Sequence, residues 1–146
     1  MINYRNMKIE DIPQVASIEK EVFSMPWSEK SFEESLQNKD TLYLVAEEDG
    51  SVSGYIGMYI SFEIGTISNV VVAPAQRRKG IAKQLLERLL KASDACGVES
   101  VTLEVRESNR PAIELYEKAG FVNEGIRKNF YQKPTENAII MWKYKE

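Results

Sequence analysis

One strand–loop–helix segment near the middle of the chain constrains the fold more than any other feature. A predicted strand from about Gly65 to Val72 stops at Ala73-Pro74, because proline removes a donor from a strand ladder. After a basic loop, leucines recur at helical spacing over about fifteen residues until Cys96-Gly97, where glycine suits a helix C-terminus. The next run, Val101 to Val105, alternates apolar and polar residues and is typical of a strand. The segment therefore predicts a helix that connects two strands of one sheet.

Strands and helices on both sides of this segment complete the predicted sheet. Asp49-Gly50 is a strong hairpin signal between strands at 41–47 and 52–62, and a polar loop separates strands at 121–131 and 138–144. The remaining elements are a strand at 2–6, helices at about 10–23 and 28–36, and a helix that Asn109 and Pro111 open and Gly120 closes. This order predicts an α/β (α+β) fold in which helices flank a mixed sheet.

Length and composition limit the class of protein. A chain of 146 residues with 43% hydrophobic and 28% charged residues predicts one globular domain over residues 1–146. Neither a signal peptide nor a membrane span is expected, because no apolar run is long enough. The single cysteine, Cys96, cannot form an internal disulfide, which favours a reducing, cytoplasmic location. Its place at the end of an apolar helix predicts that Cys96 lies in the core. For the whole protein, we expect a monomer or weak dimer.

The chain contains no histidine, and this absence excludes several kinds of active site. A Ser-His-Asp triad, a Cys-His pair and an imidazole base are all impossible. Zinc sites built from cysteine and histidine lack ligands, and no metal is expected. Any proton transfer must therefore use carboxylates, tyrosines, lysines, backbone groups or water.

Positive charge is concentrated in the loop before the long helix. The net charge is −3, yet residues 76–83 carry four of the 19 basic side chains and no acidic one, which leaves 15 basic against 22 acidic side chains elsewhere. A helix N-terminus offers unpaired N–H groups to an anion, and Gly80 permits close approach of the backbone. The pattern favours a local phosphate site over nucleic-acid binding. A solvated basic turn that caps the helix is the alternative.

The same loop carries a family resemblance. Arg77-x-x-Gly80-x-Ala82 after a strand resembles the signature of GCN5-related N-acetyltransferases, in which backbone amides bind the pyrophosphate of coenzyme A. The resemblance implies a splayed strand pair, with the three valines 70–72 beside the pantetheine arm; from the residues alone they are simply a buried strand. The implied coenzyme-binding residues are Val70, Val71, Val72, Arg77, Arg78, Lys79, Gly80, Ile81, Ala82, Lys83 and Asn109.

Three polar residues after this loop have structural explanations of their own. Alternation places Glu104 on the polar face of its strand, where Arg106 or a cation of a neighbouring strand can pair with it. Tyr116 falls on the apolar face of a helix and can be a core aromatic with its hydroxyl at the rim. Asn109 stands where a helix cap is expected.

A closer resemblance gives these residues further roles. The chain resembles RimI-type ribosomal-protein-alanine N-acetyltransferases over almost its whole length, through Met25-Pro-Trp-Ser28, Leu103-Glu-Val-Arg106, Ser108-Asn109, Ala112-Ile-x-Leu-Tyr116, Gly120-Phe121, Arg127-Lys-Asn-x-Tyr131 and Ala138-Ile-Ile-Met141. The resemblance implies that Glu104 is the general base and Tyr116 the general acid. It also implies that Asn109 contacts acetyl-CoA, and that Trp27 and Tyr131 line the peptide cleft. The loop before Ala138 is shorter than in some of these enzymes, which leaves the peptide preference less defined than the reaction.

The resulting hypothesis is direct acetyl transfer from acetyl-CoA to a protein N-terminus. The expected acceptor is the N-terminal alanine of small-subunit ribosomal protein bS18, with no membrane and no direct nucleic-acid partner. Two alternatives remain open. One is an acetyltransferase of the same fold that acts on a small amine or on lysine, and the other is a module that binds acyl-CoA without turnover.

Overall fold

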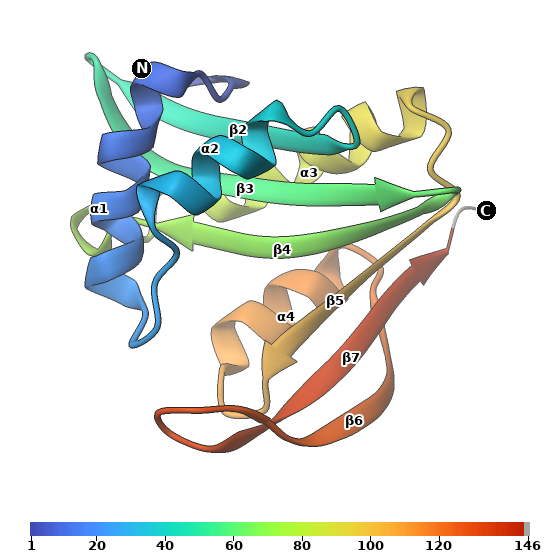
Figure 1. The fold of residues 1–146 in the computed structure, drawn as a ribbon. Coiled ribbons are helices and arrows are strands. Elements are labelled where there is room, and N and C mark those ends of the chain that lie inside the picture. Colours follow the sequence, from blue (N-terminus) through green and yellow to red (C-terminus); the bar gives the residue numbers. More distant parts are fainter. Residues whose placement is uncertain (145–146) are drawn as a thin grey trace.

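The computed structural model describes residues 1–144 as a seven-stranded sheet with helices on both faces (Figure 1). The strand order is β1-β2-β3-β4-β5-β7-β6. Every neighbouring pair is antiparallel except β4 and β5, which are parallel, so the predicted mixed sheet is confirmed. The strands are β1 (Asn3–Asn6), β2 (Thr41–Glu48), β3 (Ser51–Ser61), β4 (Ile64–Val72), β5 (Ser100–Arg106), β6 (Val122–Tyr131) and β7 (Glu136–Tyr144).

The helices are divided between the two faces of the sheet. They are α1 (Ile12–Val22), α2 (Glu29–Gln37), α3 (Ile81–Ala95) and α4 (Arg110–Lys118). In Figure 1, α1 and α2 lie in front of the sheet, whereas α3 and α4 lie behind it. Among residues 1–144, no helix is long and apolar enough to cross a membrane.

The helices begin and end largely where the sequence predicts. The Ser28 hydroxyl accepts a hydrogen bond from the Ser31 N–H at 3.1 Å, and the Asn109 side chain accepts one from the Ala112 N–H at 3.2 Å. The first helix differs from the prediction, because residues 9–11 form a 3-10 turn before α1. In that turn the Asp11 carboxylate accepts the Lys8 N–H at 2.7 Å.

The parallel pair β4–β5 opens into a V, and this is the feature that positions the site. Pairing between these strands extends only from Ile64–Ser100 to Thr66–Thr102, after which they diverge (Figure 1). A bulge follows in β4, since Gly57 pairs with Asn69 and Met58 with Ile67, which leaves Ser68 as the extra residue. Bulges bend the strand that contains them. The predicted splayed strand pair is therefore present, and β1–β4 form one arm of the V while β5, β7 and β6 form the other.

Apolar side chains pack on both faces of the sheet. Behind it, Leu85, Leu86 and Leu89 of α3 are buried against the strands, as their helical spacing predicts. In front, Phe32 of α2 packs in a second cluster with Tyr55 of β3. The prediction for Cys96 is wrong: its side chain is exposed. Cys96 is the residue at which α3 ends, so it leaves the buried stripe.

Candidate functional site

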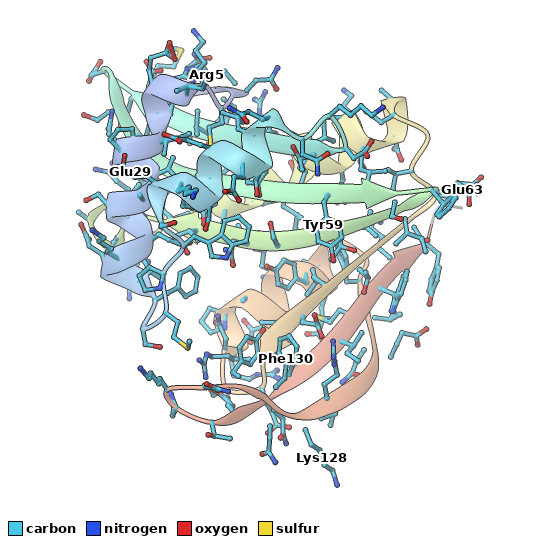
Figure 2. The ribbon with its side chains drawn as sticks, viewed as in Figure 1. Arg5, Glu29, Tyr59, Glu63, Lys128 and Phe130 are labelled. Atoms are coloured by element: carbon cyan, nitrogen blue, oxygen red, sulfur yellow. The ribbon has the colours of Figure 1, made fainter. Side chains whose placement is uncertain are left out.

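A cleft of about 780 Å³ lies between the two arms of the V. Residues from α1 and the α1–α2 segment line it in front of the sheet, and residues of α4 line it from behind. The cleft therefore extends between the arms from one face of the sheet to the other. Figure 2 shows two of its lining residues, Tyr59 and Phe130, on opposite arms. Its lining residues include Glu19, Ser24, Trp27, Asn69, Val70, Glu104, Arg106, Asn109, Tyr116, Tyr131 and Lys133.

Glu104 lies at the centre of this arrangement, on the polar face of β5. Its side chain is 28% exposed, and its Oε2 accepts a hydrogen bond from Arg127 Nη1 of β6 at 2.6 Å. The strand alternation predicted this face, and a cation does pair with the carboxylate. The cation is Arg127, however, and the guanidinium of Arg106 on the same strand bonds elsewhere.

Tyr116 approaches the cleft from α4 behind the sheet. Its side chain is buried, and its ring packs against the Phe121 ring with centroids 5.7 Å apart. Burial raises the pKa of the Tyr116 phenol above its ordinary value, and nearby Tyr131 raises it further. Tyr116 is thus both a core aromatic, as its helical position predicts, and a protonated hydroxyl at the cleft.

Tyr131, at the end of β6, belongs to the same group of side chains. Burial, together with a smaller contribution from the Glu104 carboxylate, raises the pKa of Tyr131 to about 12. The Arg106 guanidinium lies over its ring, 4.5 Å from the centroid. Arg106 also donates hydrogen bonds to the carbonyl groups of Gln132 and Pro134, each at 3.0 Å. One guanidinium thus holds both Tyr131 and the loop that follows it.

The front wall of the cleft is the segment between α1 and α2. The Trp27 ring packs against Phe32, with ring centroids 5.3 Å apart. The Ser24 hydroxyl donates a hydrogen bond of 2.8 Å to the Lys133 carbonyl, so this segment contacts the β6–β7 loop across the cleft. Sequence reasoning missed Glu19 in this wall. The available signal was a carboxylate on the apolar face of a helix, between Val15 and Val22.

The basic turn forms a separate surface at the start of α3. Arg77, Arg78 and Lys79 are exposed, and Gly80 has a left-handed φ of +74°. A Cβ at Gly80 would meet nothing within 4 Å, so the space in front of this backbone is open. The first hydrogen bond of the helix runs from the Gln84 N–H to the Gly80 carbonyl at 3.1 Å, which leaves the preceding amides at the helix end.

The structure brings only part of the predicted site to the cleft itself. Trp27, Val70, Glu104, Asn109, Tyr116 and Tyr131 line it, but residues 77–83 do not. Val71 is 2% exposed and packs in the front core, as a buried strand predicts. Asn109 caps α4 with its side chain, which is its structural explanation. Among residues 1–144, no group of three or more metal-ligating side chains occurs.

Comparison with known proteins assigns the chain to a family. The family model described as the acetyltransferase (GNAT) family matches residues 12–121. The chain belongs to the acetyltransferase (GNAT) family. It is therefore an acetyltransferase, and enzymes of the GNAT family use acetyl-CoA as co-substrate.

Individual relatives of this GNAT chain cover almost its whole length. The [ribosomal protein bS18]-alanine N-acetyltransferase of Escherichia coli (strain K12) is 36% identical over 140 residues, which are 93% of each chain. A protein of Bacillus subtilis (strain 168), provisionally named for the same activity, is 40% identical over 94% of this chain and 92% of its own. The crystal structure of the ribosomal-protein-S18-alanine N-acetyltransferase from Escherichia coli superimposes with a TM-score of 0.91 at 33% identity, covering 99% of this chain and 94% of that one. The predicted resemblance is confirmed.

The site of this GNAT enzyme is compatible with acetyl-CoA. The open backbone at Gly80 and the exposed cations before it suit an anionic pyrophosphate. The divergent arms of the V leave room beside Val70 for an extended chain, because β5 no longer pairs with β4 there.

Proposed function

We propose that this enzyme transfers the acetyl group of acetyl-CoA directly to a protein N-terminal α-amine, and that the acceptor is the N-terminal alanine of ribosomal protein bS18. The observation that carries the proposal is the convergence of Glu104 and Tyr116 on one cleft from opposite faces of the sheet. The relatives named for this activity match more than nine-tenths of the chain, which supports the choice of acceptor. The proposal places the enzyme in the cytoplasm, where ribosomal proteins are made.

The chemistry of amines favours an N-terminus over lysine as acceptor. An amine must be neutral to attack a thioester. An α-amino group has a pKa of about 7.7–8.0, so roughly a quarter of it is neutral near pH 7.4, whereas lysine, at about 10.4, is neutral in only about one molecule per thousand. A weakly basic carboxylate can therefore complete the deprotonation of an N-terminal ammonium far more easily than that of lysine.

Glu104 has the position that a general base requires. Its carboxylate lines the cleft on the front face, and its Oε1 accepts no hydrogen bond from the residues that the structure describes. That oxygen can take the proton of the acceptor ammonium directly or through a water. The ion pair with Arg127 orients the other oxygen and leaves Oε1 to face the cleft.

Tyr116 supplies a proton donor on the opposite side of the cleft. The hydroxyl is protonated at neutral pH, as an ordinary phenol is, and can donate a hydrogen bond to a sulfur that becomes negative. Acetyl-CoA supplies the activated thioester. Backbone N–H groups of β4 near Val70 lie on the edge that faces the cleft, where they can stabilise negative charge on a carbonyl oxygen.

A mass-spectrometric assay tests the proposal. Purified enzyme is incubated with acetyl-CoA and a peptide that begins with the N-terminal alanine of bS18 and contains an internal lysine. We expect one acetyl group, located on the α-amine by fragmentation. The matched control is the same peptide with a blocked N-terminus, which should remain unmodified. Acetylation of lysine alone, or of neither amine, would show that the proposed acceptor is wrong.

A further inference from the structure

Glu19 is a buried carboxylate that the proposed reaction does not use. It lies in α1, its side chain is 1% exposed, and it lines the cleft. Among residues 1–144 it forms no ion pair with a lysine, an arginine or the N-terminus. Burial of an uncompensated carboxylate is costly unless hydrogen bonds satisfy both oxygens. Such a group requires a structural or functional explanation.

Two donors from different elements satisfy this carboxylate. Glu19 Oε2 accepts the Trp27 backbone N–H at 2.9 Å, and Oε1 accepts a short hydrogen bond from the Tyr55 hydroxyl of β3. Asn69 of β4 donates in turn to the Tyr55 oxygen at 3.4 Å. Burial and the adjacent Glu19 carboxylate raise the pKa of Tyr55, so the phenol keeps its proton and acts as the donor. The carboxylate therefore connects the α1–α2 segment to the arm of the V that contains β3 and β4.

The Trp27 end of this network depends on Glu19 because no regular element holds it. Residues 24–27 lie between the end of α1 at Phe23, whose N–H bonds the Glu19 carbonyl, and the start of α2 at Ser28, whose carbonyl accepts the Phe32 N–H, so they belong to no helix or strand. The Trp27 ring contacts Phe32, which packs edge-on against the Tyr55 ring with centroids 5.5 Å apart. The ring contacts determine how closely the α1–α2 segment packs against the sheet, and the hydrogen bond from the Trp27 N–H to Glu19 holds its backbone.

We propose that Glu19 is a positioning residue that holds the Trp27 wall of the cleft and thereby sets the affinity for the acceptor peptide. This inference rests on the proposed function for its kinetic consequence. Glu19 acts through the Trp27 backbone and does not touch the reacting atoms. The proposed phosphate site at residues 77–83 does not line the cleft and does not contact this network, so the larger effect is expected on the acceptor peptide.

Two substitutions separate positioning from charge. Glu19→Leu removes both acceptor oxygens and puts an aliphatic side chain in the buried space. Glu19→Gln removes the charge but keeps an oxygen for the Trp27 N–H, because the Tyr55 hydroxyl can turn to accept from the new amide. We expect Glu19→Leu to raise KM for the alanine peptide at least about tenfold, with acetyl-CoA affinity within about twofold of wild type. Glu19→Gln should restore KM to within about threefold of wild type.

The matched control is Glu21→Leu, which changes an exposed carboxylate of the same helix and should alter neither constant. Should Glu19→Leu not fold, Glu19→Met replaces it in the comparison. A Glu19→Gln enzyme as impaired as Glu19→Leu would overturn the inference, since charge would then be the relevant property. Equal losses of peptide and acetyl-CoA affinity would also overturn it, because they would indicate a general structural role.

Hydrogen exchange of the Trp27 amide gives a readout that needs no acetyl transfer. We expect this amide to exchange at least about tenfold faster in Glu19→Leu than in wild type, and near the wild-type rate in Glu19→Gln. Unchanged exchange in Glu19→Leu would contradict the positioning role even in an active enzyme. If the wild type fails to acetylate the alanine peptide while exchange behaves as expected, the proposed function is wrong and the positioning of Trp27 still holds.

Discussion

Glu104 of β5 and Arg127 of β6 form an ion pair with an N–O distance of 2.6 Å, although β7 lies between their strands. The Arg127 side chain is 55% exposed, and ion pairs of that kind contribute only about 0–1 kcal/mol. Arg127 therefore orients the carboxylate without withdrawing it from the cleft. Such a weak constraint suits a group that must exchange a proton with an incoming ammonium.

Substitution of Glu104 should have an effect that depends on pH. We expect Glu104→Gln to lower kcat/KM for the peptide by about 10²–10³ near pH 6.5, where the acceptor is protonated and needs a base. The ratio of wild-type to variant rates should shrink toward about pH 9, because most of the acceptor is then already neutral. Initial rates across this range provide the measurement, with the exposed neighbour in Glu107→Gln as control. A ratio that stays constant with pH would exclude Glu104 as the base.

Tyr116→Phe should reduce turnover without loss of binding. The ring of phenylalanine retains the contact with Phe121, so only the hydroxyl is removed. We expect kcat to fall by about 10–10³-fold, with acetyl-CoA affinity unchanged. Single-turnover kinetics and calorimetry measure the two quantities. Tyr144→Phe, which removes an exposed hydroxyl bonded to Glu124, is the control. Unchanged single-turnover rates in Tyr116→Phe would exclude the proton-donor role.

The raised pKa of Tyr116 also predicts alkaline destabilisation. In the unfolded chain this phenol ionises near its ordinary pKa of about 10, whereas the buried phenol ionises only at higher pH. Its contribution to stability is thus complete below about pH 10 and decreases by up to about 1.4 kcal/mol per pH unit above it. Denaturant unfolding between about pH 9 and 11.5 should show a shallower decrease for Tyr116→Phe than for wild type. Parallel curves for the two proteins would mean that burial does not raise the pKa of Tyr116.

Replacement of single cations in the basic turn should weaken acetyl-CoA binding in a salt-dependent way. Arg78 has a φ of +70°, and Arg78→Asn keeps a residue that tolerates this conformation. We expect the acetyl-CoA Kd to rise about three- to tenfold at low ionic strength, and by less at high ionic strength, because salt screens exposed charges. Titration calorimetry measures both values. Lys91→Ala, at an exposed position further along α3, should leave the Kd unchanged. A Kd for Arg78→Asn equal to that of wild type would show that Arg78 does not contribute to phosphate binding.

Arg106 should control peptide affinity through the β6–β7 loop. Besides the carbonyl groups of Gln132 and Pro134, its guanidinium bonds Glu136 Oε1 at 3.2 Å. A lysine cannot reproduce this planar set of donors, so Arg106→Lys is not conservative here. We expect Arg106→Lys to raise the peptide KM about threefold to tenfold, with a smaller change in kcat. Lys128→Ala, whose side chain points away from the cleft in Figure 2, is the control. A change in kcat alone would contradict the proposed support of the loop.

Local signals predicted much of the fold because they act over a few residues. Asp49-Gly50, the Ser28 cap and the Asn109 cap lie where expected, and so does the alternation around Glu104. The prediction for Cys96 failed because helical spacing does not define the last residue of a helix. The buried place near that end belongs to Ser93, whose hydroxyl bonds the Leu90 carbonyl at 2.8 Å.

The candidate site was less accessible from sequence, because its contacts join distant segments. Family resemblance supplied Glu104 and Tyr116, but their approach from opposite faces depends on how far β4 and β5 diverge. The pairing of Glu104 with Arg127 depends on the strand order, which no local pattern contains. Glu19 was missed for the same reason, since its partners Trp27 and Tyr55 come from a segment and a strand that only folding brings together.

The bulge and the divergence of β4 from β5 also bear on resistance to aggregation. Unpaired strand edges usually invite strands of other molecules to add to a sheet. Here two such edges face each other inside the V, with helices in front and behind, and not at the outer border of the sheet. A strand that is still part of another protein's sheet needs more room between the arms than a single extended chain does. The opening therefore admits a single extended chain more readily than the strand of a folded protein. The unpaired edges of β4 and β5 can bind such a chain while they stay protected from strand addition of the kind that forms fibres.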